Sequence, residues 1–314
     1  MTATKAIRVA ILGAGMIGEV HRRAAQLAGA QVVGVMASTP ERSREVAERT
    51  GMVNTMPFAY RFHPMVREMR ARVQSEEFGA VNLMHGSYLQ DWLLNPRATS
   101  WRVDPKAGGP SRAFGDIGSH WCDLVEWVTG DRIASLVSTT SITIKQRPGA
   151  TAASFSAAAS DAPLVDVTTE DTALIMFRTV NDVAGSAVIS QLSAGRKNHL
   201  WVEVDGMQQS AVFNQELSEQ LLLGDEEGYK TLVRDPNHGA PEQRRLATLP
   251  AGHAQGYAQC FEAYVADSYA AIDAQQGQGE RPEGLPTFAD GARAAAICDA
   301  MLRSAASREW VEVG

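Results

Sequence analysis

Cysteine is scarce in this sequence. Its 314 residues include only three, Cys122, Cys260 and Cys298, and no two of them stand in a CxxC spacing. An odd number of widely separated cysteines argues against a disulfide framework and against a zinc site. We therefore predict no disulfide and no metal site, and we expect a cytoplasmic location, because the cytoplasm keeps thiols reduced.

Long apolar runs and an excess of basic residues are also missing. The apolar run Ile7–Leu12 leads straight into glycines. It is far shorter than the roughly 20 residues that a membrane helix needs, and too short for the core of a signal peptide. The formal net charge is -7, whereas nucleic-acid binders normally carry a basic patch or a high pI. We therefore expect neither a membrane nor a nucleic acid as a partner.

The remaining composition is that of an ordinary globular protein, with 45% hydrophobic and 21% charged residues. The length is enough for two domains of about 100–200 residues each. We predict a shortened nucleotide-binding domain over 1–62 and a second domain over 63–314. The C-terminal helix is expected to pack back on the first domain.

The first 62 residues alternate between strand and helix patterns, which is typical of a parallel sheet. Pro57 in the last strand indicates an edge strand or a bulge. The predicted elements are a strand at Ile7–Leu12, a helix at Met16–Leu27, a strand at Gln31–Met36, a helix from Pro40 to Gly51, and a strand at Val53–Phe62.

The later part of the chain changes character, because several strand patterns follow one another without helices between them. Such a series predicts an α+β domain with an open, mainly antiparallel sheet. The predicted elements are helices at Val66–Val73, Ile117–Val128, Gln255–Ile272 and Phe288–Ala306, strands at Val81–Leu89, Thr172–Thr179, Ala184–Leu192, His199–Val204 and Ser210–Asn214, and loops at Asp104–Pro110 and Gly149–Pro163.

A glycine motif, GxGxxG, follows the first predicted strand and opens the first predicted helix. Gly13 permits a tight turn, Gly15 lets the backbone approach a pyrophosphate, and Gly18 lets the helix pack on the strand. The helix N-terminus, at Met16 and Ile17, offers free N–H groups to phosphates. The motif predicts dinucleotide binding, and the alternative is a plain glycine turn.

The residues after the second strand bear on the choice between NAD and NADP. An acidic residue normally binds the ribose hydroxyls about 20 positions after the glycines. Here Ser38 and Arg42 could bind a 2′-phosphate instead, which favours NADP. Glu41 could still serve NAD, and Arg42 with Arg44 could form an ordinary solvated helix face.

Asp116 and His120 form a second motif. They are four residues apart, so on a helix they share one face. A histidine is a natural proton acceptor for an alcohol that becomes a carbonyl, and a nearby carboxylate can orient the ring. The alternative is that Asp116 caps the helix and His120 is a buried polar residue.

These two motifs, in this order, resemble the glucose–fructose oxidoreductase and inositol dehydrogenase family (Gfo/Idh/MocA). The resemblance implies a Rossmann domain, a second domain with an open sheet that forms a homo-oligomer, and NAD(P)-linked oxidation or reduction of a sugar, polyol or cyclic alcohol. The similarity extends to further segments of the chain: Pro57–Pro64, Gly86–Trp92, Trp101-Arg102, Leu285–Gly291 and Trp310–Val313.

The resemblance also implies roles for single residues. Asp116 and His120 would act near the substrate and the nicotinamide. Aromatic rings stack on sugars, while arginine and glutamine bind hydroxyl groups, although core packing or a surface role would account for such residues equally well. The residues expected in the substrate wall are Tyr88, Gln90, Trp92, Arg102 and Tyr257.

One element of the family pattern is missing. The family carries a catalytic lysine in a Glu-Lys-Pro motif, and this sequence contains no such motif. The first domain is also short by two or more strand–helix units, on the order of 60 residues. We therefore predict an internal deletion that impairs the activity. The alternatives are a non-catalytic sugar- or nucleotide-binding protein and a subunit whose sheet mainly forms an interface.

Overall fold

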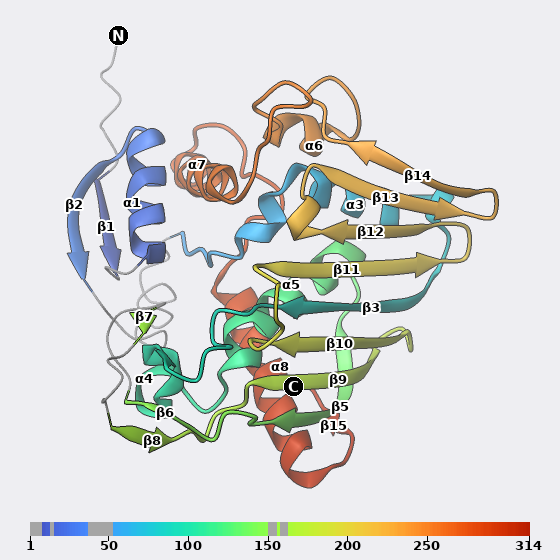
Figure 1. The fold of residues 1–314 in the computed structure, drawn as a ribbon. Coiled ribbons are helices and arrows are strands. Elements are labelled where there is room, and N and C mark those ends of the chain that lie inside the picture. Colours follow the sequence, from blue (N-terminus) through green and yellow to red (C-terminus); the bar gives the residue numbers. More distant parts are fainter. Residues whose placement is uncertain (1–7, 13–15, 37–52, 150–155, 158–162) are drawn as a thin grey trace. The chain divides into compact units, whose positions relative to one another are not determined.

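The computed structural model describes residues 8–12, 16–36, 53–149, 156–157 and 163–314 (Figure 1). The chain divides into two compact units. Unit 1 comprises Met1–His63 and Gln255–Gly291, and unit 2 comprises Pro64–Ala254 and Ala292–Gly314. Unit 1 thus joins the N-terminal segment to a stretch near the C-terminus. The domain boundary expected after residue 62 stays a prediction.

Unit 1 begins with a strand–helix–strand unit. Strand β1 (Arg8–Leu12), helix α1 (Met16–Leu27) and strand β2 (Gln31–Met36) follow one another. β1 and β2 pair in parallel, with Arg8 opposite Gln31. A parallel pair needs a crossover connection, which α1 supplies. The three elements predicted from the sequence are confirmed here to within one residue.

The strand predicted at Val53–Phe62 is wrong. Its first part is irregular, and Ala59–Phe62 form a short 3-10 helix, η1. Pro57 has no N–H to give to a strand, and the N–H of Met56 donates to the carbonyl of Pro286 (2.9 Å). Among the described residues, β1 therefore pairs only with β2. The helix predicted from Pro40 to Gly51 lies outside the described residues.

Helix α7 (Tyr257–Gln275) supplies the core of unit 1 and packs against α1 and η1. The ring of His21 meets that of Phe261 edge-on, with 5.0 Å between centroids. Tyr264 packs edge-on against Phe62 at 5.7 Å. Its hydroxyl group lies 2.7 Å from Thr55 Oγ1. Aromatic contacts therefore tie the irregular segment after residue 53 to a helix more than 200 positions later in the sequence.

Unit 2 is built on a nine-stranded sheet. β3 and β10 pair in parallel, and the other pairings in the sheet are antiparallel. The predicted open, mainly antiparallel sheet is therefore confirmed. The strands, in spatial order, are β14 (Gly228–Val233), β13 (Gln220–Asp225), β12 (Ser210–Asn214), β11 (His199–Gly206), β3 (Val81–Leu89), β10 (Ala184–Ser190), β9 (Thr172–Thr179), β5 (Ile133–Ser141) and β15 (Val311–Glu312).

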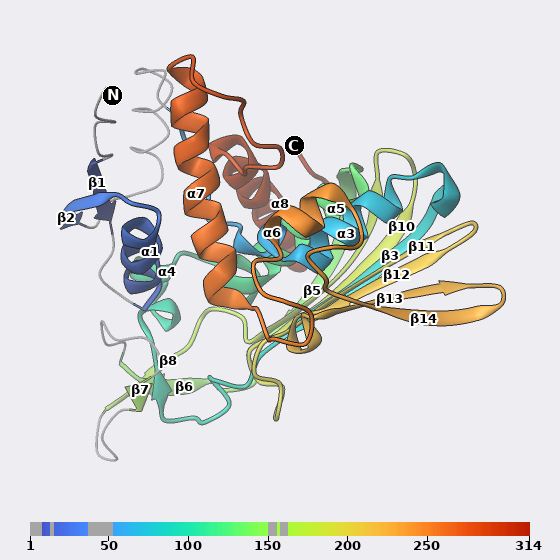
Figure 2. The same ribbon diagram turned by 90° about the horizontal axis from the view of Figure 1, so that it is seen from above.

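Helices cover one face of this sheet, as Figure 2 shows. They are α3 (Pro64–Val73), which the short α6 (Pro241–Leu246) adjoins, α5 (Ser119–Thr129) and α8 (Phe288–Ser307). The opposite face has no helix on it in the described part of the chain. Side chains of β9 therefore alternate between buried and exposed, and Leu174 and Met176 on the open face are 43% and 59% exposed.

Gly86 in β3 allows a close approach between the sheet and α5. The indole Nε1 of Trp121 donates to the carbonyl of Trp201 across the strand (3.0 Å). A Cβ atom at residue 86 would meet both of these groups. Trp121 is fully buried, so this glycine fixes how closely α5 packs on the sheet.

The connections of unit 2 hold several short elements. The loop predicted over 104–110 contains a helix, because Asp104 caps it and Pro105 suits a first turn. The loop predicted over 149–163 lies mostly outside the described residues. The short elements are η2 (Glu76–Phe78), β4 (Ala98–Thr99), η3 (Trp101–Val103), α4 (Pro105–Gly108), η4 (Phe114–Gly118), β6 (Gln146–Pro148), β7 (Ser156–Ala157), β8 (Leu164–Asp166) and η5 (Gln215–Leu217).

All three cysteines are free thiols, as predicted. No helix in the described ranges combines the length and the apolar character that crossing a membrane requires.

Candidate functional site

The predicted substrate residues of unit 2 gather where two neighbouring strands end. β3 and β10 run in parallel, and their last residues, Leu89 and Ser190, are paired. The next residues along the chain, Gln90 and Gln191, therefore leave the sheet at the same edge. The N–H of Gln90 donates to the carbonyl of Ser190 (2.8 Å), which holds the two exits together.

A hydrogen-bonded chain runs through three of the predicted wall residues. Asn198 Oδ1 accepts from the Tyr88 hydroxyl group (2.7 Å) and from Gln90 Nε2 (2.9 Å). Gln90 Oε1 in turn accepts from Trp92 Nε1 (2.7 Å). Tyr88 is buried and Trp92 is half-buried. The side chains are therefore held in fixed orientations, as a preorganised binding surface requires.

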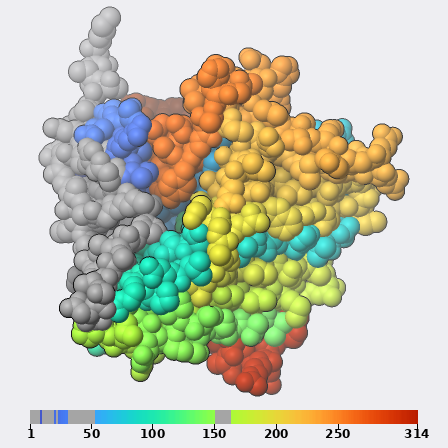
Figure 3. All heavy atoms as spheres, in the orientation of Figure 1, coloured from blue at the N-terminus to red at the C-terminus, as the bar shows by residue number. Residues whose placement is uncertain are grey.

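At this edge the loop that follows β3 contacts the loop that precedes β11. Lys197 Nζ lies 2.6 Å from Asp91 Oδ2, and the N–H of Gly195 donates to the same oxygen (3.1 Å). In Figure 3 the teal atoms of the segment that follows β3 lie beside the yellow atoms of the loop that precedes β11. The contact keeps Asn198 next to Gln90.

Arg102 connects this wall to the acidic residue of the second motif. Its guanidinium carbon lies 4.6 Å from the ring centroid of Trp101 and 5.7 Å from that of Trp92. Its Nε donates to Asp116 Oδ1 (2.8 Å). The rings and the carboxylate together restrict the guanidinium group to one position.

Both carboxylate oxygens of Asp116 have donors. Arg102 holds Oδ1, and Gln191 Nε2 donates to Oδ2 (3.0 Å). Asp116 stands in η4, a π-helical turn that continues into α5, so the predicted helix begins three residues earlier than the sequence suggested. π-helical turns are rare and are frequent at functional sites.

His120 lies on the same helix as Asp116, four residues later, and is half-buried. Burial lowers the pKa of His120, and the nearby negative charge of Asp116 acts in the opposite direction. The net effect is a lowered pKa, so the imidazole is neutral at pH 7. A neutral imidazole can accept a proton, whereas an imidazolium cannot.

The other predicted site residues are divided between unit 1 and undescribed segments. Tyr257 belongs to unit 1, where its ring centroid lies 6.1 Å from that of Tyr60 and 5.0 Å from that of Phe261. Met16, Ile17 and Gly18 form the first turn of α1. Gly13, Gly15, Ser38 and Arg42 lie outside the described residues.

The sequence analysis missed two residues of this arrangement, Gln191 and Asn198, and it noted Trp101 only as part of a segment similar to the family. The one signal that could have found Gln191 is the parallel pairing of β3 with β10, because carboxyl ends of parallel strands meet at one edge. Strand patterns alone do not reveal which strands pair, so no sequence signal was available for Asn198.

A separate group of titratable side chains lies on the open face of the sheet. His85 Nε2 is 3.7 Å from Glu203 Oε2 and 3.5 Å from Asp205 Oδ2. Burial, and then the charge of Asp205, raise the pKa of Glu203. Among the described residues, this is the one group of three such side chains close enough to share a metal ion. The prediction of no metal site stays a prediction.

Comparison with known proteins identifies relatives. Residues 66–212 match the sequence model of a family described as the GFO/IDH/MocA C-terminal domain. The chain is 30% identical to the levoglucosan dehydrogenase of Pseudarthrobacter phenanthrenivorans over 292 residues, which cover 88% of this chain and 72% of that protein.

Two solved structures share the fold. An oxidoreductase domain protein from Kribbella flavida is 29% identical, with a TM-score of 0.74 over 89% of this chain and 73% of that one. A levoglucosan dehydrogenase in complex with NADH and levoglucosan is 22% identical, with a TM-score of 0.80 over 99% of this chain and 100% of that one.

Proposed function

The chain belongs to the Gfo/Idh/MocA family of oxidoreductases, and from that premise we propose that it is an NAD(P)-dependent dehydrogenase acting on a sugar, polyol or cyclic alcohol. The observation that carries the proposal is the arrangement around Asp116. Its carboxylate is held at both oxygens, and a half-buried histidine with a lowered pKa follows on the same helix.

His120 is the proton acceptor in this proposal. Oxidation of an alcohol releases a hydride from carbon and a proton from oxygen, and a bound nicotinamide supplies the hydride acceptor. The neutral imidazole takes the hydroxyl proton. Arg102 and Gln191 already occupy both oxygens of Asp116, so Asp116 acts on His120 through its charge and position.

The wall residues favour a neutral, hydroxyl-rich substrate. Arg102 is paired with Asp116, so the two charges largely cancel. The Gln90 amide group accepts from the indole nitrogen of Trp92 and donates to Asn198, which also accepts from the Tyr88 hydroxyl group. Aromatic faces and amide groups are the partners that sugar rings and hydroxyl groups prefer. The relative that acts on levoglucosan, an anhydrosugar, supports this class of substrate.

The residues of unit 1 fit a dinucleotide. β1 ends at Leu12 and α1 begins at Met16, so the motif Gly13–Gly18 starts directly after the strand and ends in the first turn of the helix. The first N–H groups of α1 have no partners within the helix and carry a partial positive charge, which suits a pyrophosphate. A similar structure contains NADH, and we propose NAD or NADP here, with Ser38 and Arg42 favouring NADP.

The absent Glu-Lys-Pro motif leaves a second candidate function, a non-catalytic sugar- or nucleotide-binding protein. Loss of the family's lysine would remove one proton-transferring group, which is worth roughly 10²–10⁴ in rate. The cation next to Asp116 in unit 2 is Arg102, and an arginine side chain does not exchange protons near neutral pH. The specific alternative to the dehydrogenase is therefore a protein that still binds its sugar or nucleotide but has little or no catalytic activity.

One experiment separates the two functions. NADH or NADPH is added and its fluorescence is followed. NAD⁺ or NADP⁺ is then supplied with a panel of sugars and polyols that includes levoglucosan, and absorbance at the nicotinamide band is followed. We expect binding and turnover, with turnover reduced about 10²–10⁴-fold in His120→Ala. His238→Ala, which removes an exposed histidine of unit 2, is the matched control.

Three outcomes are informative. Binding without turnover supports the binding protein. Turnover that His120→Ala leaves unchanged contradicts the assigned proton acceptor. Absence of nucleotide binding contradicts the dehydrogenase and a nucleotide-binding protein, and leaves a sugar-binding protein or a subunit that forms an interface.

We also propose that the protein is a homo-oligomer that pairs through the open face of its sheet. That face exposes Leu83, Leu174, Met176 and Val188, each at least 37% exposed. Apolar area of this kind is removed from water when two copies pair. Sedimentation should show an oligomer that Met176→Glu dissociates, whereas a wild-type monomer would contradict the proposal.

A further inference from the structure

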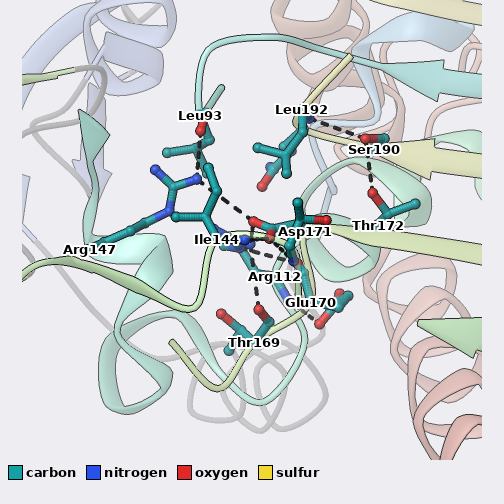
Figure 4. Close-up of polar contacts among 12 residues, drawn as sticks. Leu93, Arg112, Ile144, Arg147, Thr169, Glu170, Asp171, Thr172, Ser190 and Leu192 are labelled. Carbon is teal, nitrogen blue, oxygen red and sulfur yellow. Dashed lines mark hydrogen bonds and ion pairs between the residues drawn. The ribbon is translucent and has the colours of Figure 1, made fainter. Parts of the chain in front are cut away.

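Unit 2 buries a group of four charged side chains next to the candidate site: Arg112, Arg147, Glu170 and Asp171, here called the buried charge cluster (Figure 4). Asp171 pairs with Arg112 and lies 3.8 Å from Arg147. Burial, and then the neighbouring Arg112, lower the pKa of Arg147 to about 10. Charges in such a place are costly, since apolar side chains of similar volume often stabilise a core as well or better.

Glu170 fixes the start of the helix that carries Asp116 and His120. Its carboxylate accepts from Ser111 Oγ (2.7 Å), from the N–H of Arg112 (3.1 Å) and from the N–H of Phe114 (2.9 Å). The first N–H groups of a helix lack partners within it, and a negative charge is stabilised there. The carboxylate therefore sets both the position and the direction of the first turn.

Arg147 fixes a different part of the site. Its guanidinium group donates to the carbonyls of Leu93 (2.5 Å), Asn95 (2.9 Å) and Ala98 (3.2 Å). These carbonyls belong to the segment between Trp92 and Arg102. Three bonds from one rigid, planar group hold that segment as a unit.

Asp171 connects the cluster to the other partner of Asp116. The carbonyl of Asp171 accepts from the N–H of Gln191 (3.1 Å), whose side chain donates to Asp116 Oδ2. Its carboxylate accepts from the N–H groups of Thr143 and Ile144 (2.7 and 3.0 Å). The cluster thus reaches Asp116 through the helix start, through Gln191 and through the segment that ends in Arg102.

We propose that Glu170 and Arg147 are positioning residues with separate tasks. Glu170 orients the Asp116–His120 helix and so governs the chemical step. Arg147 orients the Trp92–Arg102 segment and so governs substrate binding. The effects on the chemical step and on substrate binding rest on the proposed function. The positioning of the two segments involves residues of unit 2 alone.

The test compares Glu170→Gln and Arg147→Lys with a matched control, Arg234→Lys. Arg234 is also fully buried in unit 2 and donates to three carbonyls, those of Leu249 (2.6 Å), Pro250 (3.1 Å) and His253 (2.7 Å). A lysine carries its donors on a single nitrogen and cannot match the planar guanidinium geometry at either position, so both arginine variants lose stability. Only Arg147 lies next to the site.

We expect the two variants to change different kinetic constants, kcat in Glu170→Gln and KM in Arg147→Lys. A misplacement of about 1 Å can cost 10²-fold in rate, so we expect Glu170→Gln to lower kcat about 10- to 100-fold with little change in KM. Arg147→Lys should raise KM for the sugar about 10-fold and leave kcat nearly unchanged. Arg234→Lys should alter neither constant. Equal effects of all three variants on both constants would overturn the inference.

A second readout keeps this test separate from the proposed function. The imidazole resonance of His120, identified by its loss in His120→Gln, is followed by NMR as the pH is changed. Glu170→Gln should shift its titration midpoint, and Arg234→Lys should not. If the wild-type protein has no turnover but this shift occurs, the proposed function fails and the positioning role stands. If the midpoint does not shift in Glu170→Gln, the positioning role fails.

Should Glu170→Gln not fold, Ser111→Ala replaces it. This variant removes one of the three donors to Glu170 and leaves the charges in place. A smaller shift of the His120 midpoint in the same direction supports the inference, and an unchanged midpoint contradicts it.

Discussion

In unit 1 the residues predicted to bind the pyrophosphate all lie within the short motif Gly13–Gly18, whereas in unit 2 the contacts around the candidate site join residues 75 and 110 positions apart. The first arrangement needs a strand, a turn and a helix, all local. The second needs a nine-stranded sheet whose parallel pair brings Gln90 and Gln191 to one edge.

The difference shows how each region depends on the rest of the protein. A glycine motif such as Gly13–Gly18 reflects backbone requirements of a few neighbouring residues, so it can be recognised in a short stretch of sequence. The pair of Arg102 and Asp116 depends on packing, on Gln191 and on the buried charge cluster. We therefore expect substitutions to act locally in unit 1 and over longer distances in unit 2.

The largest effect is expected from crowding the sheet of unit 2. In Gly86→Val the new side chain meets Trp121 and the carbonyl of Trp201, so α5 must move away from β3. Overpacking of this kind costs about 1–3 kcal/mol, which urea unfolding would measure as a lower midpoint. Ser87→Val, the next residue on the same strand, is the control, because its side chain points to the other face. An equal loss of stability in both variants would contradict this account.

A smaller and more local effect is expected in unit 1. Gly15→Asp adds a side chain and a negative charge where the motif predicts phosphates, so Kd for NADH should rise at least about tenfold, or ~1.4 kcal/mol. Urea unfolding of unit 2 should not change. Gly29→Ala, at the other end of α1, should leave Kd unchanged. Comparable weakening by Gly29→Ala would show that the glycine motif has no special role.

The smallest effect concerns pH. The lowered pKa of His120 keeps its imidazole neutral at pH 7, and kcat/KM should fall as the pH drops through that pKa. The charge of Asp116 opposes the lowering, so Asp116→Asn should lower the pKa further and move the acid limb of the profile to lower pH. Asp235→Asn, beside the exposed His238, should leave the limb in place. An acid limb that moves upward in Asp116→Asn would contradict the assigned interaction.

Much of the fold could be predicted from the sequence. Strands β3, β9 and β12 and helix α1 have the predicted bounds, because alternating or helical apolar periodicity extends over each of them. Strands β5, β13 and β14 were not predicted. The segment 53–62, expected to be a strand, has an irregular first part followed by a 3-10 helix. That segment is shaped by contacts with α7 and Pro286, which no local pattern contains.

The candidate site divides in the same way. The sequence by itself determined the glycine motif and the four-residue spacing of Asp116 and His120, because each is a property of one short stretch of backbone. Only the tertiary structure decided that Arg102 and Gln191 hold Asp116, that Asn198 joins Tyr88 to Gln90, and that Tyr257 belongs to unit 1. Strand pairing and the burial of charge depend on the whole chain, and their energies are set by partners distant in sequence.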